Sequence, residues 1–201
     1  SYVHGPNEPW LTRINRDDSR ELTPIFDSFL GKMHFDKYYY DKATAFYNSL
    51  ENCEKIHIVH LRNEQDAITH WAKINNMSEE DYRNKYETHI LESIAQHIDS
   101  SDHIVMLTSL VENNPVINSL RGEGFNVVCR NNEPIGREMN GIIDLLIGRF
   151  CNGIFIGNCD TETWQGSTFS YTLYNQLDPK IKCIFINMDK INEKHVIKIK
   201  E

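Results

Sequence analysis

The sequence predicts an α/β fold, a Rossmann-like, doubly wound parallel sheet of about five strands with helices on both faces. Short, continuous apolar runs alternate along the chain with amphipathic helical patterns, as in strands that are buried on both faces. The 201 residues are 40% hydrophobic, which is enough for one domain with a buried core. Residues 1–21 mix Gly, Pro, Asn and charge without periodicity, so we expect an arm or linker there and a single domain over residues 22–201.

The first half of the chain predicts three helices and two strands. In order, these are a short helix over 22–30, a helix over 36–50, a strand over 55–62, a polar loop over 63–66, a helix over 78–98 and a strand over 103–109. Ser78 is a favourable N-cap with Asp81 three residues later. The helix that follows carries an apolar residue at every fourth position, at Tyr82, Tyr86, Ile90, Ile94 and Ile98.

The second half continues the alternation. It predicts a short helix over 115–120 that glycines end, a strand over 125–130, an amphipathic helix over 139–150, a strand over 154–156, a helix over 169–177 and a strand over 182–187. Asp144 lies on the flank of the apolar stripe of its helix. Ser167 or Thr168 is a suitable N-cap for the helix over 169–177. The charged tail after residue 187 can add an edge strand.

Composition excludes several classes of protein. A net charge of −8 repels the phosphate backbone and argues against nonspecific nucleic-acid binding. No apolar run reaches membrane-spanning length, and residues 1–21 contain no signal-peptide core. The five cysteines show no Cys-x-x-Cys spacing and mostly adjoin apolar runs. We therefore expect small buried thiols and a reducing, cytoplasmic compartment, with the endomembrane lumen as the alternative.

Polar side chains follow each predicted strand. They are His60 and Arg62, Thr108 and Ser109, Arg130 and Asn131, Gly157 and Asn158, and Asn187. The carboxyl ends of parallel strands meet at one edge, where ligands bind, and the helix start at Ser167–Thr168 adds free N–H groups. Arginines, hydroxyls and a helix N-terminus favour a phosphorylated ligand. Neither the Gly-x-Gly-x-x-Gly nor the Walker motif is present, and no Gly-x-Ser-x-Gly elbow indicates a hydrolase.

The sequence does not predict a metal site, because its nine histidines are scattered and His57 and His60 fall on opposite faces of one strand. Glu64 and Asp66 follow Arg62 and are compatible with acid–base chemistry. The alternative is a solvated loop whose carboxylates pair with the neighbouring arginine.

Several of these segments resemble one glycosyltransferase family. His60-Leu-Arg62 is similar to the His-x-Arg element of the GDP-fucose-dependent fucosyltransferases. The segments 143–148, 155–159 and 167–170 resemble, in the same order, the donor-site block of the protein O-fucosyltransferases. Together the matches span residues 33–188. The insertion over 160–165 departs from the family pattern and affects the loop between the last two segments.

The resemblance implies an inverting, metal-independent GT-B glycosyltransferase, with this chain as the carboxyl-terminal half that binds the donor. GDP-fucose is the expected donor and no cofactor is expected. Arg62 would contact the diphosphate and stabilise the leaving group, which makes it the expected catalytic residue. The expected donor-binding residues are His60, Arg62, Asp144, Asn158, Ser167, Thr168 and Phe169, with Asp144 on the base. Structural roles stay open, as a salt bridge for Arg62, a helix-dipole carboxylate for Asp144 and core packing for Phe169.

The partners follow from the same resemblance. A nucleotide-sugar donor and a glycan or protein acceptor are expected. The acceptor site comes either from an amino-terminal domain outside this chain, which in the family supplies the candidate catalytic base, or from a minimal site made by the short amino-terminal region of this chain. Rhamnose is an alternative donor sugar. A non-catalytic nucleotide-sugar or glycan-binding module is the alternative function. A flavodoxin-like domain fits less well, because the first strand ends at His60 and Arg62 rather than at acidic residues.

Overall fold

A six-stranded sheet in the order β3-β2-β1-β4-β5-β6 forms the centre of the chain. The structure, a computed structural model, describes residues 32–50, 53–160, 166–193 and 196–199, so the arm predicted over 1–21 and the helix predicted over 22–30 lie outside it. The elements are α3 (Lys37–Asn48), β1 (Ile56–His60), α4 (Gln65–Ile74), α5 (Glu79–His97), β2 (His103–Leu107), α6 (Pro115–Gly122), β3 (Asn126–Cys129), α7 (Arg137–Gly148), β4 (Ile154–Gly157), α8 (Thr168–Gln176), β5 (Lys182–Phe185) and β6 (Val196–Ile199).

Strand pairing confirms the predicted fold class. β1 pairs in parallel with both β2 and β4, and the β2–β3 and β4–β5 pairs are also parallel. The carboxyl ends of these five strands therefore face the same edge of the sheet. β6 lies at the edge of the sheet opposite β3 and runs antiparallel to β5, so the sheet has one strand more than the parallel set predicted from the apolar runs.

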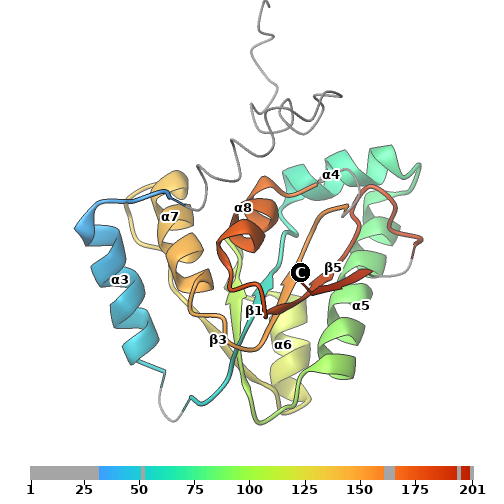
Figure 1. The fold of residues 1–201 in the computed structure, drawn as a ribbon. Helices are drawn as coiled ribbons and strands as arrows, with labels where there is room; N and C mark the ends of the chain where they lie inside the picture. The colour runs from blue at the N-terminus through green and yellow to red at the C-terminus, as the bar shows by residue number, and fades with distance from the viewer. Residues whose placement is uncertain (1–31, 51–52, 161–165, 194–195, 200–201) are drawn as a thin grey trace, which may run out of the picture.

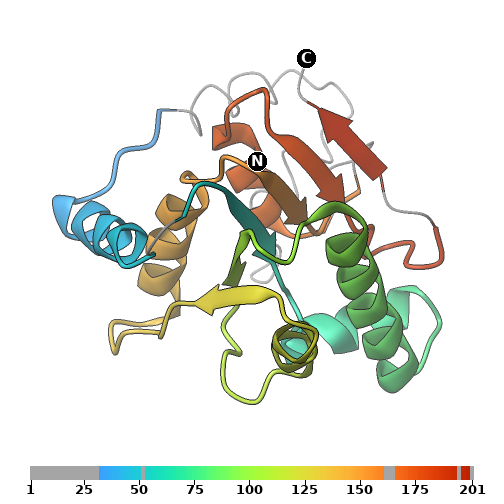
Figure 2. The same ribbon diagram turned by 90° about the horizontal axis from the view of Figure 1, so that it is seen from below.

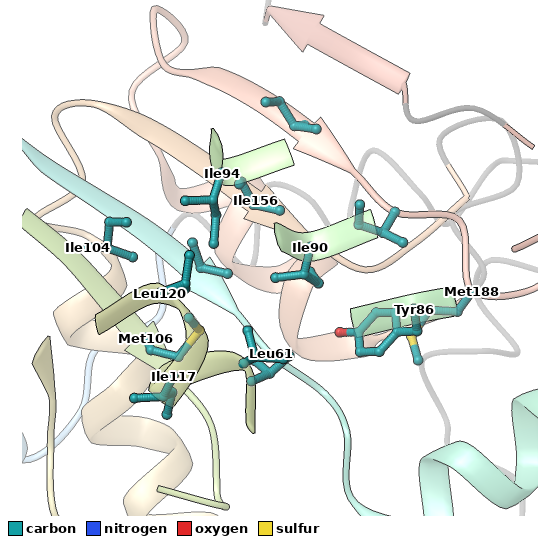
Figure 3. Close-up of a cluster of buried hydrophobic side chains, with 14 of the residues drawn as sticks. Leu61, Tyr86, Ile90, Ile94, Ile104, Met106, Ile117, Leu120, Ile156 and Met188 are labelled. Carbon is teal, nitrogen blue, oxygen red and sulfur yellow. The ribbon is translucent and has the colours of Figure 1, made fainter. Parts of the chain in front are cut away.

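Helices cover both faces of the sheet, with α4, α5 and α6 on one side and α3, α7 and α8 on the other (Figures 1 and 2). On the first side, the predicted stripe of α5 is fully buried, and Tyr86, Ile90 and Ile94 pack against residues of β1, β2 and β4 (Figure 3). On the second side, α3 lies along α7, where the rings of Tyr47 and Phe150 stack with their centroids 4.5 Å apart. Apolar faces on both sides explain why the strands are continuous apolar runs.

Capping side chains begin the helices where the sequence predicts. The Ser78 side chain accepts a hydrogen bond from the backbone N–H of Asp81 at the start of α5. Ser167, rather than Thr168, caps α8 and accepts from the backbone N–H of Ser170. Both caps satisfy N–H groups that have no partner within the helix.

The sequence interpretation was wrong about α4. It placed a polar loop over 63–66 and no helix between that loop and Ser78, whereas α4 begins at Gln65 and ends at Ile74. The helix buries only three side chains, Ala67, Ile68 and Ala72, and two of these are alanines. Its apolar residues nevertheless recur at helical spacing, at Ala67, Ile68, Trp71 and Ala72, so the sequence carried a signal for this helix that the interpretation overlooked.

All five cysteines are described and none forms a disulfide. Cys151, Cys159 and Cys183 are buried, as expected for small apolar side chains. Among the helices of the described residues, none combines the length and apolar character needed to cross a membrane.

Candidate functional site

A pocket of about 480 Å³ opens at the carboxyl ends of β1, β2 and β3. This volume lies within the range of roughly 300–1,000 Å³ found for small-molecule sites. The residues that follow β1 and β2 form one wall, the β3–α7 loop and the first turns of α7 form another, and one side chain of α8 closes it. The lining includes His60, Arg62, Glu64, Thr108, Ser109, Asn132, Glu133, Gly136, Arg137, Asn140, Gly141, Asp144 and Phe169.

Arg62 lines this pocket with a guanidinium that the protein hardly engages. Its backbone N–H donates to the Tyr86 hydroxyl at 3.0 Å, which fixes the main chain just beyond β1. The side chain is 29% exposed, and its Nη2 lies 4.0 Å from the carboxylate of Asp66, which is itself 62% exposed. An ion pair so long and so exposed contributes little. The forked donors of Arg62 therefore remain available to an anion in the pocket.

Arg130, the other arginine predicted at this edge, is engaged within the protein. Its Nε and Nη2 donate to Oδ1 of Asp144 at 3.0 and 2.8 Å. Its two Nη atoms also donate to Asn140, to the side-chain oxygen at 3.0 Å and to the carbonyl at 3.2 Å. The side chain is 10% exposed. Arg130 thus fastens β3 to α7 and holds one wall of the pocket.

His60 is a buried neutral imidazole that also lines the pocket. Its Nδ1 lies 2.8 Å from Oγ of Ser170 and 3.3 Å from Nδ2 of Asn158. Because the amide nitrogen of Asn158 can only donate, Nδ1 is assigned as the acceptor of that contact. The ring proton is therefore on Nε2. Burial lowers the pKa of His60 from 6.5 to about 3, with a smaller contribution from the Arg62 charge.

Phe169 packs against this imidazole, with the two ring centroids 4.6 Å apart. It reaches the pocket from the first turn of α8 and is partly exposed there. The arrangement leaves Nε2–H of His60 and the face of Phe169 as one polar and one aromatic contact on the same wall. A hydrogen-bond donor beside an aromatic ring suits a nucleotide.

Asn158 lies beneath the pocket and does not line it. It is fully buried, and its Oδ1 accepts from the Tyr86 hydroxyl at 2.7 Å while its amide donates to the carbonyl of His60. Each of these groups would lose a buried partner without it. In the structure, Asn158 supports His60 and the chain leading to Arg62.

Asp144 does line the pocket, from the flank of α7. Burial raises the pKa of this carboxyl, and the charge and hydrogen bonds of Arg130 oppose that rise. Both Arg130 hydrogen bonds go to Oδ1. Within the described part of the chain, no hydrogen bond reaches Oδ2. That oxygen is the part of Asp144 available to a ligand.

The predicted helix-start residues of α8 lie differently. Ser167 is buried and its hydroxyl caps the helix, and neither Ser167 nor Thr168 lines the pocket. The structure thus brings His60, Arg62, Asp144 and Phe169 together and places the other three predicted residues outside the lining.

The start of α7 lies at the pocket instead, and the sequence interpretation missed it. Gly136 is the N-cap, with φ of 96° and no side chain to bond the first N–H groups. Asn140 closes the loop before it by donating to the carbonyls of Glu133 and Gly136 at 2.9 and 2.8 Å. The available signal was the Pro134-Ile-Gly136 turn directly before an amphipathic stripe.

Among the residues that the structure describes, no group of three or more His, Cys, Asp or Glu side chains is placed to hold a metal ion. The positive groups at the pocket are the side chains of Arg62 and Arg137.

Comparison with solved structures shows a likeness to a crystal structure of NodZ α-1,6-fucosyltransferase soaked with GDP-fucose. The match covers 100% of this chain and 74% of that chain, with a TM-score of 0.50 and 14% sequence identity. No protein-family model matches the sequence, and the search of curated proteins finds no match. At this identity the likeness concerns the fold. The chain has a fucosyltransferase-like fold built on a six-stranded, mostly parallel sheet.

Proposed function

We propose that this chain binds the nucleotide-sugar donor of an inverting, metal-independent glycosyltransferase, with GDP-fucose as the donor. The observation that carries the proposal is Arg62, whose guanidinium is barely engaged and lines a pocket at the carboxyl edge of the parallel strands. Nε2–H of His60 and the ring of Phe169 lie on the same wall. The structural neighbour was soaked with GDP-fucose, which supports the same ligand class.

In this proposal, Arg62 holds the diphosphate and stabilises the charge that develops when the bond to the sugar breaks. A fixed cation in a partly buried pocket stabilises such charge more than water does. Nε2–H of His60 donates a hydrogen bond to the nucleotide, and the ring of Phe169 packs against the nucleotide. Oδ2 of Asp144 accepts from the base. Ser167, Thr168 and Asn158 act by holding α8 and the end of β1 in place.

The direct test is to incubate the chain with GDP-fucose and to measure binding and release of free fucose. Binding with slow release supports a transferase that uses water as a poor acceptor. Binding without release supports the alternative of a non-catalytic module. No binding of GDP or GDP-fucose contradicts the proposal. GDP-rhamnose in a parallel assay separates the two candidate sugars.

The first prediction concerns metal ions. GDP should bind as tightly in excess chelator as in millimolar magnesium, because Arg62 supplies the positive charge next to the diphosphate. Isothermal titration calorimetry in the two buffers measures this. A large loss of affinity in chelator would contradict metal-independent binding.

The second prediction concerns the base. GDP should bind more tightly than UDP or ADP, because guanine presents two adjacent N–H donors, N1–H and the 2-amino group, to the carboxylate of Asp144, whereas the N–H donor of uracil or adenine stands next to acceptors. Asp144→Asn keeps an oxygen for Arg130 and replaces the other with a donor that repels guanine. A hydrogen bond to a charged group contributes about 1.5–3 kcal/mol, so GDP affinity should fall by at least about 10-fold. UDP and ADP affinities should change little, and equal binding of all three nucleotides by the wild type would refute the assignment.

A further inference from the structure

Three carboxylates line the pocket, and they differ in what they contact. Oδ1 of Asp144 takes two hydrogen bonds from Arg130. Glu133 forms a 2.8 Å ion pair with Lys42 and accepts from the Tyr38 hydroxyl at 2.9 Å. The hydrogen bonds from these two partners lower its pKa, so Glu133 is a weak proton acceptor. The third is Glu64, which forms no ion pair within the described residues.

Glu64 is held at the pocket by its place in the chain. It occupies the N-cap position of α4, two residues after Arg62, yet its side chain makes no capping hydrogen bond. Instead its Oε1 accepts from Oγ of Ser109 at 2.6 Å, which ties the start of α4 to the end of β2. The carboxylate is therefore oriented by a strand-end hydroxyl rather than by its own helix.

The second oxygen of this carboxylate has no partner. Oε2 of Glu64 is buried, and no hydrogen bond reaches it from the residues that the structure describes. Leaving a carboxylate oxygen buried without a donor is costly, and such an atom calls for an explanation. Oε2 has almost no accessible surface in this structure, so a ligand hydroxyl in the pocket can provide the missing donor once the carboxyl group turns toward it.

We propose that Glu64 is the catalytic base of the glycosyl transfer, which rests on the proposed function above. Its Oε2 accepts the proton of the acceptor hydroxyl while the acceptor oxygen forms a bond to C1 of the sugar. The bond from C1 to the diphosphate oxygen breaks at the same time, and its electron pair leaves with the nucleoside diphosphate next to Arg62. After the products leave, the carboxyl group, turned toward the pocket, releases the proton to water there.

His60, the other candidate base at the pocket, is excluded by its protonation. Its Nδ1 already faces the donors of Ser170 and Asn158, and its Nε2 carries the ring proton. The imidazole can therefore donate to a ligand but cannot accept the acceptor's proton. Glu64 adds to the donor half a role that the resemblance placed in a separate acceptor domain.

The test compares Glu64→Gln with Glu80→Gln in the full chain. Glutamine keeps an oxygen for Ser109 and has almost the same shape, but it cannot accept a proton. Glu80 lies exposed in the first turn of α5, outside the pocket, and makes the same change of charge. GDP affinity and the rate of fucose release from GDP-fucose are measured for each protein over a range of pH.

Glu64→Gln should release fucose at least about 100-fold more slowly while binding GDP within about two-fold of the wild type. In the wild type, the rate of fucose release should fall at acid pH because the base is protonated. The residual rate of Glu64→Gln should not show this fall. Glu80→Gln should match the wild type throughout.

Unchanged release by Glu64→Gln would overturn the assignment of the base and leave the donor site standing. The same holds if the wild type binds GDP-fucose and never releases the sugar. Weakened GDP binding with a normal turnover rate would instead show that Glu64 binds a hydroxyl of the nucleotide. That result also overturns the assignment of Glu64 as the base. Failure of the wild type to bind GDP is the separate result that overturns the proposed function.

Discussion

Replacing Arg62 with alanine is expected to weaken GDP binding by about 10- to 150-fold, because a charge-assisted hydrogen bond to phosphate contributes about 1.5–3 kcal/mol. The fold should survive, since the hydrogen bond to Tyr86 comes from the backbone N–H of residue 62 and alanine keeps it. Arg62→Lys should recover part of the affinity, because lysine restores the charge but not the two parallel N–H donors of the guanidinium. Titration calorimetry gives the affinities and thermal unfolding checks the fold.

Arg121→Ala is the matched control. It removes the same charge from a side chain that donates to the carbonyl of Val127, away from the pocket lining. Its GDP affinity should equal that of the wild type. If Arg62→Ala unfolds the domain while the remaining folded fraction binds GDP normally, Arg62 is a structural residue and the donor-site assignment fails.

Acid is expected to destabilise the fold through His60. Its pKa is about 3 in the folded chain against 6.5 ordinarily, so below pH 6.5 the unfolded chain binds a proton that the folded chain does not. The contribution of the neutral His60 to the free energy of unfolding is therefore fully present above about pH 6.5 and is lost progressively as the pH falls toward 3. Between pH 7.5 and 4.5 this one group should remove about 2.5 kcal/mol from the free energy of unfolding.

Urea unfolding at the two pH values measures this difference directly. His60→Asn should lower the free energy of unfolding at both pH values. The difference between the two values should become about 2.5 kcal/mol smaller than in the wild type. His70→Asn, which removes an exposed imidazole from α4, should keep it. An unchanged pH dependence in His60→Asn would show that the histidine is not held neutral in the folded chain.

The sheet and most of its helices were predictable because burial on both faces leaves continuous apolar runs in the sequence. The stripe that includes Tyr86 and Ile90 and the cap at Ser78 were confirmed for the same reason, since each is a local pattern. The helix α4 was missed although its apolar residues recur at helical spacing, because its first residues belong to the polar run over 63–66 that was interpreted as a loop. The convergence of His60 and Arg62 at one edge followed from parallel pairing alone.

The pocket itself depends on contacts that no local pattern encodes. Whether an arginine is available or engaged is decided across the fold, and Arg62 and Arg130 look equivalent in the sequence. The burial of Asn158 beneath His60 arises from residues 98 positions apart. The unpaired oxygen of Glu64 emerges only when α4 and β2 are placed together.

The hydroxyl of Tyr86 gives the pocket a dependence on the opposite face of the sheet. It accepts from the backbone of Arg62 and donates to Asn158, yet it belongs to α5, which packs on the side away from α7 and α8. The positions of the residues at the pocket therefore depend in part on α5, a helix that does not line the pocket. Evolution can therefore adjust ligand affinity by repacking that distant layer, with every residue of the pocket left unchanged.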